Sequence, residues 1–220
     1  MTSAAAALPL LGLAITAGPL ELRGVTDDLL VPLAELASAG IHAPDVMPFL
    51  APWSLTPAAD MPRSMARFHW GQRAGFGPDR WSAGLAVFWH GELAGVQGID
   101  TVDYLVTRSA ETGSWLGRRY QGRGIGTAMR QVICAFAFDC LDAGQVTSAA
   151  YTDNPASLAV SRKCGYAPNG TQVRARMGRR AVLQRFVLEP DRLVRYEHEL
   201  SVRGLAAFRR SIGLDQPQGG

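Results

Sequence analysis

The sequence contains little cysteine. Its three cysteines, Cys134, Cys140 and Cys164, are odd in number and include no pair at CxxC spacing, which argues against a disulfide framework and a cysteine-based zinc site. Two of them fall at apolar positions of predicted helices, where free cysteine is commonly buried as a reduced thiol. Reduced thiols indicate a cytoplasmic protein. The four histidines show no metal-ligand spacing, so we predict no metal site.

The sequence also lacks a long apolar run and an excess of charge of either sign. Its apolar N-terminal stretch, residues 4–17, is shorter than the ~20 residues of a membrane span. The first basic residue, Arg23, comes too late for a secretory signal. We therefore expect residues 1–17 to form a loose tail, and we expect no contact with a membrane. The net charge is only +3 and no basic run is interleaved with aromatic residues, so nucleic acid is not an expected partner.

Strand and helix patterns alternate along the rest of the chain. Apolar alternation predicts strands, whereas the i, i+3, i+4 spacing from Met129 to Leu141 predicts a helix. Asn154-Pro155 opens another helix, with Asn as the N-cap and Pro at the first position. Residues 41–80 have no clean period, and we expect a pair of short irregular helices there. The predicted strands are 20–25, 85–89, 93–99, 112–116, 146–151, 182–188 and 199–202, with further helices at 29–36 and 204–212.

This order predicts an α+β fold in which helices flank a mainly antiparallel sheet. A chain of 220 residues fits one domain, with or without a short appendage.

A glycine-rich loop, Gln121-Gly122-Arg123-Gly124-Ile125-Gly126, lies between a predicted strand and the amphipathic helix. Glycines let the backbone approach a ligand closely, and the unpaired N–H groups of a helix start favour a phosphate. The loop has no Lys and is therefore not a GxxxxGK[ST] loop, and its GxGxG spacing is one residue short of the dinucleotide pattern GxGxxG. A tight turn with glycines for packing remains the alternative.

Two further segments flank this loop. Glu111-Thr112-Gly113-Ser114-Trp115-Leu116 precedes it, and Asn154-Pro155-Ala156-Ser157 and Lys163-Cys164-Gly165-Tyr166 follow it. Together with Gln121, Gly124 and Gly126 in the pattern Q/R-x-x-G-x-G/A, these segments resemble the GNAT acetyltransferases, in the branch of the ribosomal-protein N-terminal acetyltransferases RimJ and RimL. The resemblance covers residues 18–190 and implies a GNAT domain whose mixed, mostly antiparallel sheet is splayed at an acyl-CoA site. Residues 191–220 would form a C-terminal extension of a strand, a helix and a disordered end.

The resemblance implies that acetyl-CoA, or another acyl-CoA such as succinyl-CoA, is the co-substrate. It places the pyrophosphate on backbone amides of the glycine-rich loop and the pantetheine arm along the preceding strand. Arg118, Arg119 and Arg123 are either ligands of the ribose phosphate or plain surface arginines. The residues expected to bind the cofactor are Ser114, Leu116, Gln121, Gly122, Arg123, Gly124, Ile125, Gly126, Thr127, Asn154 and Ser157.

Two proton transfers remain to be assigned. Glu111 occupies a strand position where many family members carry a carboxylate, and we expect it to act as the general base, with Asp100 and Asp103 as competitors. Many family members place Tyr seven residues after the Asn of the third motif, as the acid. This chain has Ser161 there. A Ser hydroxyl is a poorer proton donor than a phenol, so Ser161 would orient the sulfur or a water at best.

The acceptor side is defined least by the sequence. Phe49, Trp53 and Trp81 are the candidate substrate contacts, because the irregular segment that holds such aromatics roofs the acceptor site in this family. The expected activity is transfer of an acyl group from CoA to a primary amine by direct attack in a ternary complex. The acceptor is a small-molecule amine or a protein N-terminus, and family analogy predicts a homodimer. Because the Tyr is missing, a catalytically impaired CoA-binding regulatory or partner-binding module is the alternative.

Overall fold

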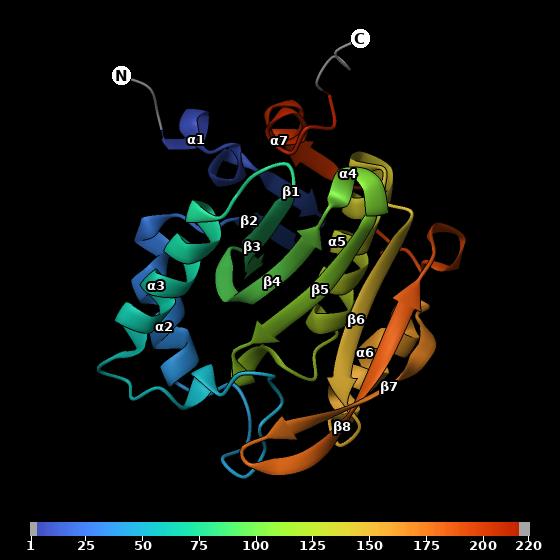
Figure 1. Ribbon diagram of the computed structural model, residues 1–220. Coiled ribbons are helices and arrows are strands. Elements are labelled where there is room, and N and C mark those ends of the chain that lie inside the picture. The colour runs from blue at the N-terminus through green and yellow to red at the C-terminus, as the bar shows by residue number, and fades with distance from the viewer. Residues whose placement is uncertain (1–3, 216–220) are drawn as a thin grey trace.

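A single nine-stranded sheet forms the centre of the molecule in the computed structural model, which describes residues 4–215. Figure 1 shows the sheet, whose strand order is β7-β8-β6-β5-β4-β3-β2-β1-β9. All neighbouring strands pair antiparallel except β5 and β6, which run parallel. The predicted α+β class with a mostly antiparallel sheet is therefore confirmed. The strands are β1 (Ala14–Ala17), β2 (Leu20–Gly24), β3 (Arg80–Trp89), β4 (Glu92–Val102), β5 (Ser109–Leu116), β6 (Gln145–Tyr151), β7 (Ala167–Arg176), β8 (Arg179–Leu188) and β9 (Ser201–Arg203).

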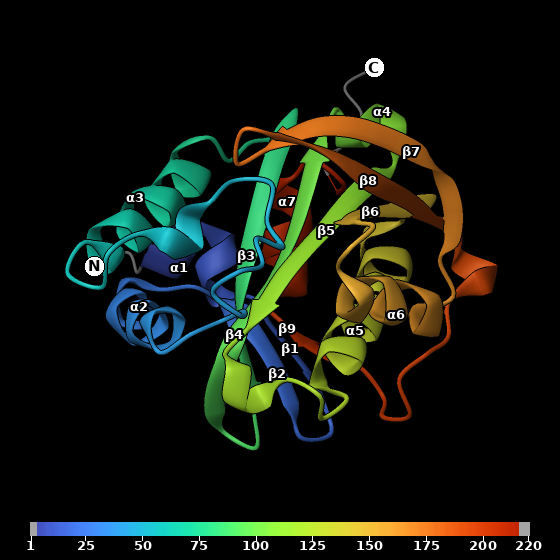
Figure 2. The same cartoon turned by 90° about the horizontal axis from the view of Figure 1, so that it is seen from below.

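Two pairs of helices cover the two faces of this sheet (Figures 1 and 2). On one face α2 (Leu30–Ser38) and α3 (Met61–Ala74) pack on alternate residues of β3 and β4, among them Phe88 and Val96. On the other face lie α5 (Ile125–Leu141) and α6 (Pro155–Cys164), and the apolar side of α5 meets the remaining residues of the same strands. Period-two alternation of each strand thus builds two cores, one on either side of the sheet. The short helices are α1 (Ala4–Ala7), α4 (Tyr104–Thr107) and α7 (Leu205–Ser211).

The N-terminal segment is part of the core, and the expectation of a loose tail is wrong for residues 4–17. The helix α1 and a 3₁₀ turn (Pro9–Gly12) lead into β1, which pairs with β2 on one side and β9 on the other. Leu10, Leu13 and Ile15 are buried. The apolar stretch is long because it supplies both a buried turn and an inner strand. Residues 1–3 lie outside the described part of the chain.

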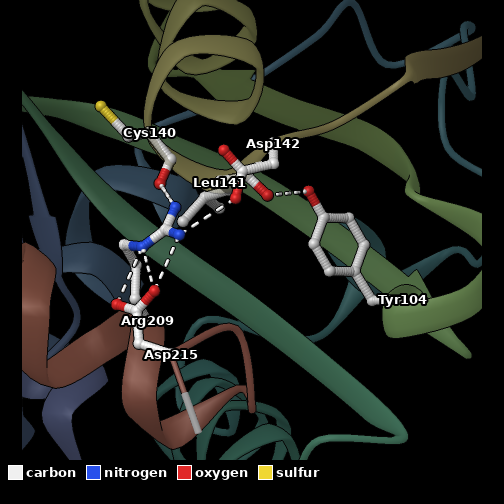
Figure 3. Close-up of polar contacts among 6 residues, drawn as sticks. All are labelled: Tyr104, Cys140, Leu141, Asp142, Arg209 and Asp215. Carbon is white, nitrogen blue, oxygen red and sulfur yellow. Dashed lines mark hydrogen bonds and ion pairs between the residues drawn. The ribbon is translucent and has the colours of Figure 1, made fainter. Parts of the chain in front are cut away.

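The C-terminal strand and helix are confirmed as β9 and α7, but they complete the sheet and do not form an appendage. Phe208 of α7 and Ile212 just after it are wholly buried. Figure 3 shows how Arg209 fixes this helix to the end of α5, donating to Asp142, Asp215 and the Cys140 carbonyl, while Tyr104 donates to the Leu141 carbonyl. The predicted disordered end falls on residues 216–220, which lie outside the described residues.

Two elements differ from their sequence-based predictions. Residues 41–80 hold a 3₁₀ turn (Trp53–Leu55) and one regular fourteen-residue helix, α3, instead of two short irregular helices. The strand β7 was not predicted, because none of its residues is buried and it therefore carries no apolar alternation. Within residues 4–215, no helix is long and apolar enough to cross a membrane.

Candidate active site

The sheet opens at its centre, between β5 and β6. These parallel strands pair only where Ser109–Glu111 lies beside Gln145–Thr147. Beyond that point β5 continues to Leu116 and β6 to Tyr151 without further pairing between them. The predicted splay is therefore confirmed, and we call this opening the gap.

The backbone of β5 offers unpaired hydrogen-bonding groups to the gap. The Gly117 N–H, just after β5, donates to the Ala94 carbonyl of β4 (2.9 Å). Because backbone groups alternate in direction along a strand, those of Ser114 and Leu116 point the other way, toward β6. The Leu116 carbonyl accepts from the Gln121 side chain (2.8 Å), whereas the strand pairing leaves the Leu116 N–H and both backbone groups of Ser114 without a partner on β6. An extended ligand can pair there as an additional strand.

The glycine-rich loop follows β5 and opens α5. The N–H groups of the five residues 122–126 have no acceptor among residues 4–215. Gly124 has a left-handed φ of +83°, and a Cβ added to it would meet nothing within 4 Å. The loop backbone at this residue is therefore exposed to solvent. Consecutive free N–H groups at a helix start form a site for an anion.

The ends of the predicted amide run are already engaged. The Gln121 N–H donates to the Arg118 carbonyl (3.2 Å) and the Thr127 N–H to the Gly124 carbonyl (3.0 Å). The Gln121 side chain donates to the carbonyls of Ile41 (2.6 Å) and Leu116 (2.8 Å), which braces the loop against β5 and the segment after α2. Of the predicted stretch Gln121–Thr127, only the N–H groups of residues 122–126 are therefore free to bind an anion. The side chains of Arg118, Arg119 and Arg123 are exposed around it.

On the far side of the gap, the start of α6 has the predicted N-cap. The Asn154 side-chain oxygen accepts from the Ser157 N–H (3.1 Å), and Pro155 is the first helical residue. Ser161, the residue expected to orient the sulfur, is completely buried, and its hydroxyl has no hydrogen-bond partner. In this conformation it is enclosed by protein and not presented at a surface.

Two carboxylates lie side by side on the α2–α3 face of the sheet. Asp100 of β4 is directly opposite Glu111 of β5 in the antiparallel register. Both side chains are exposed, yet the protein walls around Asp100 raise the pKa of its carboxyl by desolvation, against the opposing effects of Ser82 and Arg80. Glu111 and Asp100, which the sequence offers as competing bases, therefore form one pair. Asp103 lies beyond the end of β4, in a left-handed turn before α4.

Of the three predicted acceptor contacts, two lie on the same face as this carboxylate pair. The ring centroids of Phe49 and Trp53 are 5.1 Å apart, and those of Trp53 and Trp115 of β5 are 5.6 Å apart. Trp81 is wrong as a substrate contact, because its side chain is 0% exposed and packs on Tyr104 and Phe208 in the core of the other face. Among residues 4–215, no group of three or more His, Cys, Asp or Glu side chains is arranged to hold a metal ion.

Comparisons with known proteins identify the family. The acetyltransferase (GNAT) domain matches residues 20–167. The chain is 33% identical over 88 residues to a Bacillus subtilis (strain 168) protein named "Putative ribosomal N-acetyltransferase YdaF"; the alignment covers 40% of this chain and only 46% of that relative.

Solved structures share the fold. RimJ of Mycobacterium smegmatis, in complex with a CoA disulfide, superposes with a TM-score of 0.69 at 18% identity, covering 84% of this chain and 90% of RimJ. RimL, a ribosomal L7/L12 α-N-protein acetyltransferase in complex with coenzyme A, superposes with a TM-score of 0.65 at 20% identity, covering 79% of this chain and 95% of RimL. The domain match spans all three motifs completely, and these motifs surround the gap. The chain therefore belongs to the GNAT acetyltransferase family.

Proposed function

We propose that this protein is an N-acetyltransferase that moves the acetyl group of acetyl-CoA to a primary amine by direct attack in a ternary complex. The observation that carries the proposal is the presence of two sets of unpaired backbone groups beside the gap: those of Ser114 and Leu116 on β5, and the free N–H groups of residues 122–126. A ligand with an extended, amide-containing arm and a pyrophosphate at one end matches these two sets in both chemistry and order.

The residues present fit such a donor. The free N–H groups of residues 122–126 would hold the pyrophosphate, with Arg118, Arg119 and Arg123 near enough in sequence to meet a further phosphate. Ser114 and Leu116 would pair with the pantetheine arm, and Asn154 and Ser157 would border it from α6. The donor supplies an acetyl group activated as a thioester. The Leu116 N–H would donate to a carbonyl oxygen on which negative charge develops.

The carboxylate pair performs the proton transfer in this proposal. An amine must be neutral to attack, and Glu111 with Asp100 would take the proton that it loses, directly or through a water. Since the pKa of Asp100 is raised, its ionised fraction grows only at higher pH than for an ordinary Asp, and the acetylation rate should rise with pH over that range.

A protein N-terminus is the acceptor that we propose, because RimL and YdaF carry the names of ribosomal-protein acetyltransferases. An N-terminus is a primary amine at the end of an extended chain, and the exposed carboxylate pair on an uncovered part of the sheet suits it. Phe49 and Trp53 would contact its first side chains. A small-molecule amine and succinyl-CoA are the competing acceptor and donor.

We also propose a homodimer in the cytoplasm, by analogy with this family; sedimentation of the purified protein tests the dimer.

The experiment that tests the function has a binding arm and a transfer arm. Calorimetry should detect acetyl-CoA binding by the wild-type protein. Release of the CoA thiol should then require an amine, tested with peptides that have free or blocked N-termini, with polyamines, and with acetyl-CoA or succinyl-CoA as donor. Glu111→Gln and Asp100→Asn should each lower kcat about 10²- to 10⁴-fold, the usual contribution of a general base, with the affinity for acetyl-CoA retained. Absence of CoA binding would refute the donor site.

The buried Ser161 hydroxyl is the one observation that favours a second function. Without a phenol at this position, the chain could bind CoA as a regulatory or partner-binding module and transfer nothing. Acetyl-CoA binding without acylation of any peptide or amine in the panel would establish this alternative.

A further inference from the structure

Arg130 is a buried cation in the interior of the candidate donor site. Only 4% of the residue is exposed. It projects from α5, and its guanidinium donates to Ser148 Oγ on β6 (2.8 Å) and to Ser114 Oγ on β5 (3.2 Å). Its Nε has no hydrogen-bond partner. Because Ser114 and Ser148 stand on the two strands that part, the guanidinium bridges the gap itself.

No opposite charge accompanies Arg130 within the structure. None of the ion pairs formed among residues 4–215 includes it. The titratable groups beside it are neutral at pH 7, because burial raises the pKa of Cys134 to about 11, that of Cys164 to about 12 and that of Tyr166 well above its ordinary value. The carboxylates of Asp100 and Glu111 lie on the opposite face of the sheet. An unpaired buried charge is costly, and here it leaves the gap positive.

Ser114 connects this charge to the space between the strands. Its side chain is partly exposed, and its hydroxyl oxygen accepts from Arg130 while its own hydrogen has no acceptor among residues 4–215. Ser148 differs, since its hydroxyl donates to the Thr112 carbonyl (3.5 Å). A hydroxyl that accepts from a guanidinium is polarised and becomes a stronger donor. Ser114 is thus the hydroxyl available to donate to a ligand in the gap.

We infer that Arg130, acting through Ser114, stabilises the negative charge that forms on the donor's sulfur as the thioester is cleaved. The inference rests on the proposed function. Ser114 would supply the hydrogen-bond donor for the departing sulfur that Ser161, which is buried and unpartnered, does not supply. The charge is fixed before the reaction starts, so little reorganisation is needed when it acts.

The step balances without a further reactant. The acceptor nitrogen forms the new C–N bond, the C–S bond breaks, and its electron pair goes to sulfur. The proton that the nitrogen loses goes to the carboxylate pair. Ser114 donates a hydrogen bond to the sulfur anion, which takes a proton from water after release. Arg130 keeps its protons throughout and is a positioning residue, while Ser114 touches the reacting sulfur.

The test compares Arg130→Met with Arg195→Met. Arg195 forms a surface ion pair (2.6 Å) with Asp139, which lies on α5 as Arg130 does. The control therefore removes an arginine that has a carboxylate partner and lies outside the gap. The thiol of bound CoA is titrated by the ultraviolet absorbance of its thiolate, with desulfo-CoA as the blank. In the wild type and in Arg195→Met the bound thiol should ionise at least about one pH unit lower than in Arg130→Met. The kcat of Arg130→Met with acetyl-CoA should fall about 10- to 100-fold at nearly unchanged KM.

Ser114→Ala keeps the inference testable if Arg130→Met does not fold, and it should reproduce both effects because the charge acts through that hydroxyl. An unchanged thiol pKa in Ser114→Ala, or in a folded Arg130→Met, would overturn the inference while leaving acetyl transfer intact. A loss confined to succinyl-CoA would also overturn it, since Arg130 would then bind an acyl carboxylate. If the wild type binds no CoA at all, the proposed function fails first and the inference fails with it.

Discussion

Replacing Gly124 by Ala tests the anion site with a matched control in the same chain. Gly124 has a φ of +83° and Gly178 has a φ of +74°, and a Cβ on either would meet nothing within 4 Å. Alanine at such a φ costs about 1–2 kcal/mol. Gly124→Ala and Gly178→Ala should therefore lower the unfolding free energy by similar amounts, which for a domain of this size shifts Tm by about 2–4 °C per kcal/mol.

Only Gly124→Ala should weaken CoA binding. Its new methyl group would occupy the open space above the free N–H groups of residues 122–126, where a phosphate must approach closely. Loss of one hydrogen bond to a charged group is worth about 1.5–3 kcal/mol, or about 10- to 150-fold in Kd. Calorimetry with CoA measures this directly, and thermal unfolding verifies that the two variants are equally stable. Equal Kd values for both variants would refute the assignment of the loop to the pyrophosphate.

Two further predictions concern stability. Burial, reinforced by the charge of Arg73, lowers the pKa of His69 to about 4 from 6.5, so the folded state keeps this imidazole neutral while the unfolded state binds a proton. The contribution of the neutral imidazole to the free energy of unfolding is therefore complete above pH 6.5 and is lost as the pH falls toward 4, by up to about 3 kcal/mol. Urea unfolding between pH 7.5 and 4.5 should show this fall in unfolding free energy in the wild type and not in His69→Gln. A fall of the same size in the variant would contradict the prediction. Arg209→Met removes the contacts of Arg209 with Asp142, Asp215 and the Cys140 carbonyl and should cost about 1–3 kcal/mol, whereas Arg210→Met on the same helix should cost less than half of that in the same assay.

Features set by neighbours in the sequence could be predicted without the structure. The cap of α6 is such a feature, because Asn154 bonds the N–H of Ser157 only three residues away. The glycine-rich loop is another, since the start of α5 and the free amides before it belong to one short segment. The strand before the loop, whose residues after Glu111 do not pair with β6, was located by the motif Glu111–Leu116. The donor side of the candidate site consists mainly of such local features.

The features that only the tertiary structure decided bring together residues far apart in the chain. The pairing of Asp100 with Glu111 depends on the register between β4 and β5, and the burial of Trp81 depends on which face of β3 meets Phe208. The apolar N-terminal stretch proved to be an inner strand because β9, from the other end of the chain, pairs with it. Arg130 gave no signal in the sequence, where it sits among ordinary helix residues. The role proposed for Arg130 depends on its burial beside two serines on separate strands, with no carboxylate to pair with it among the described residues. The sequence alone thus identified the family and its glycine-rich loop through local hydrogen-bonding and backbone preferences, whereas long-range packing and strand register decided which charges face the gap and which side chains are buried.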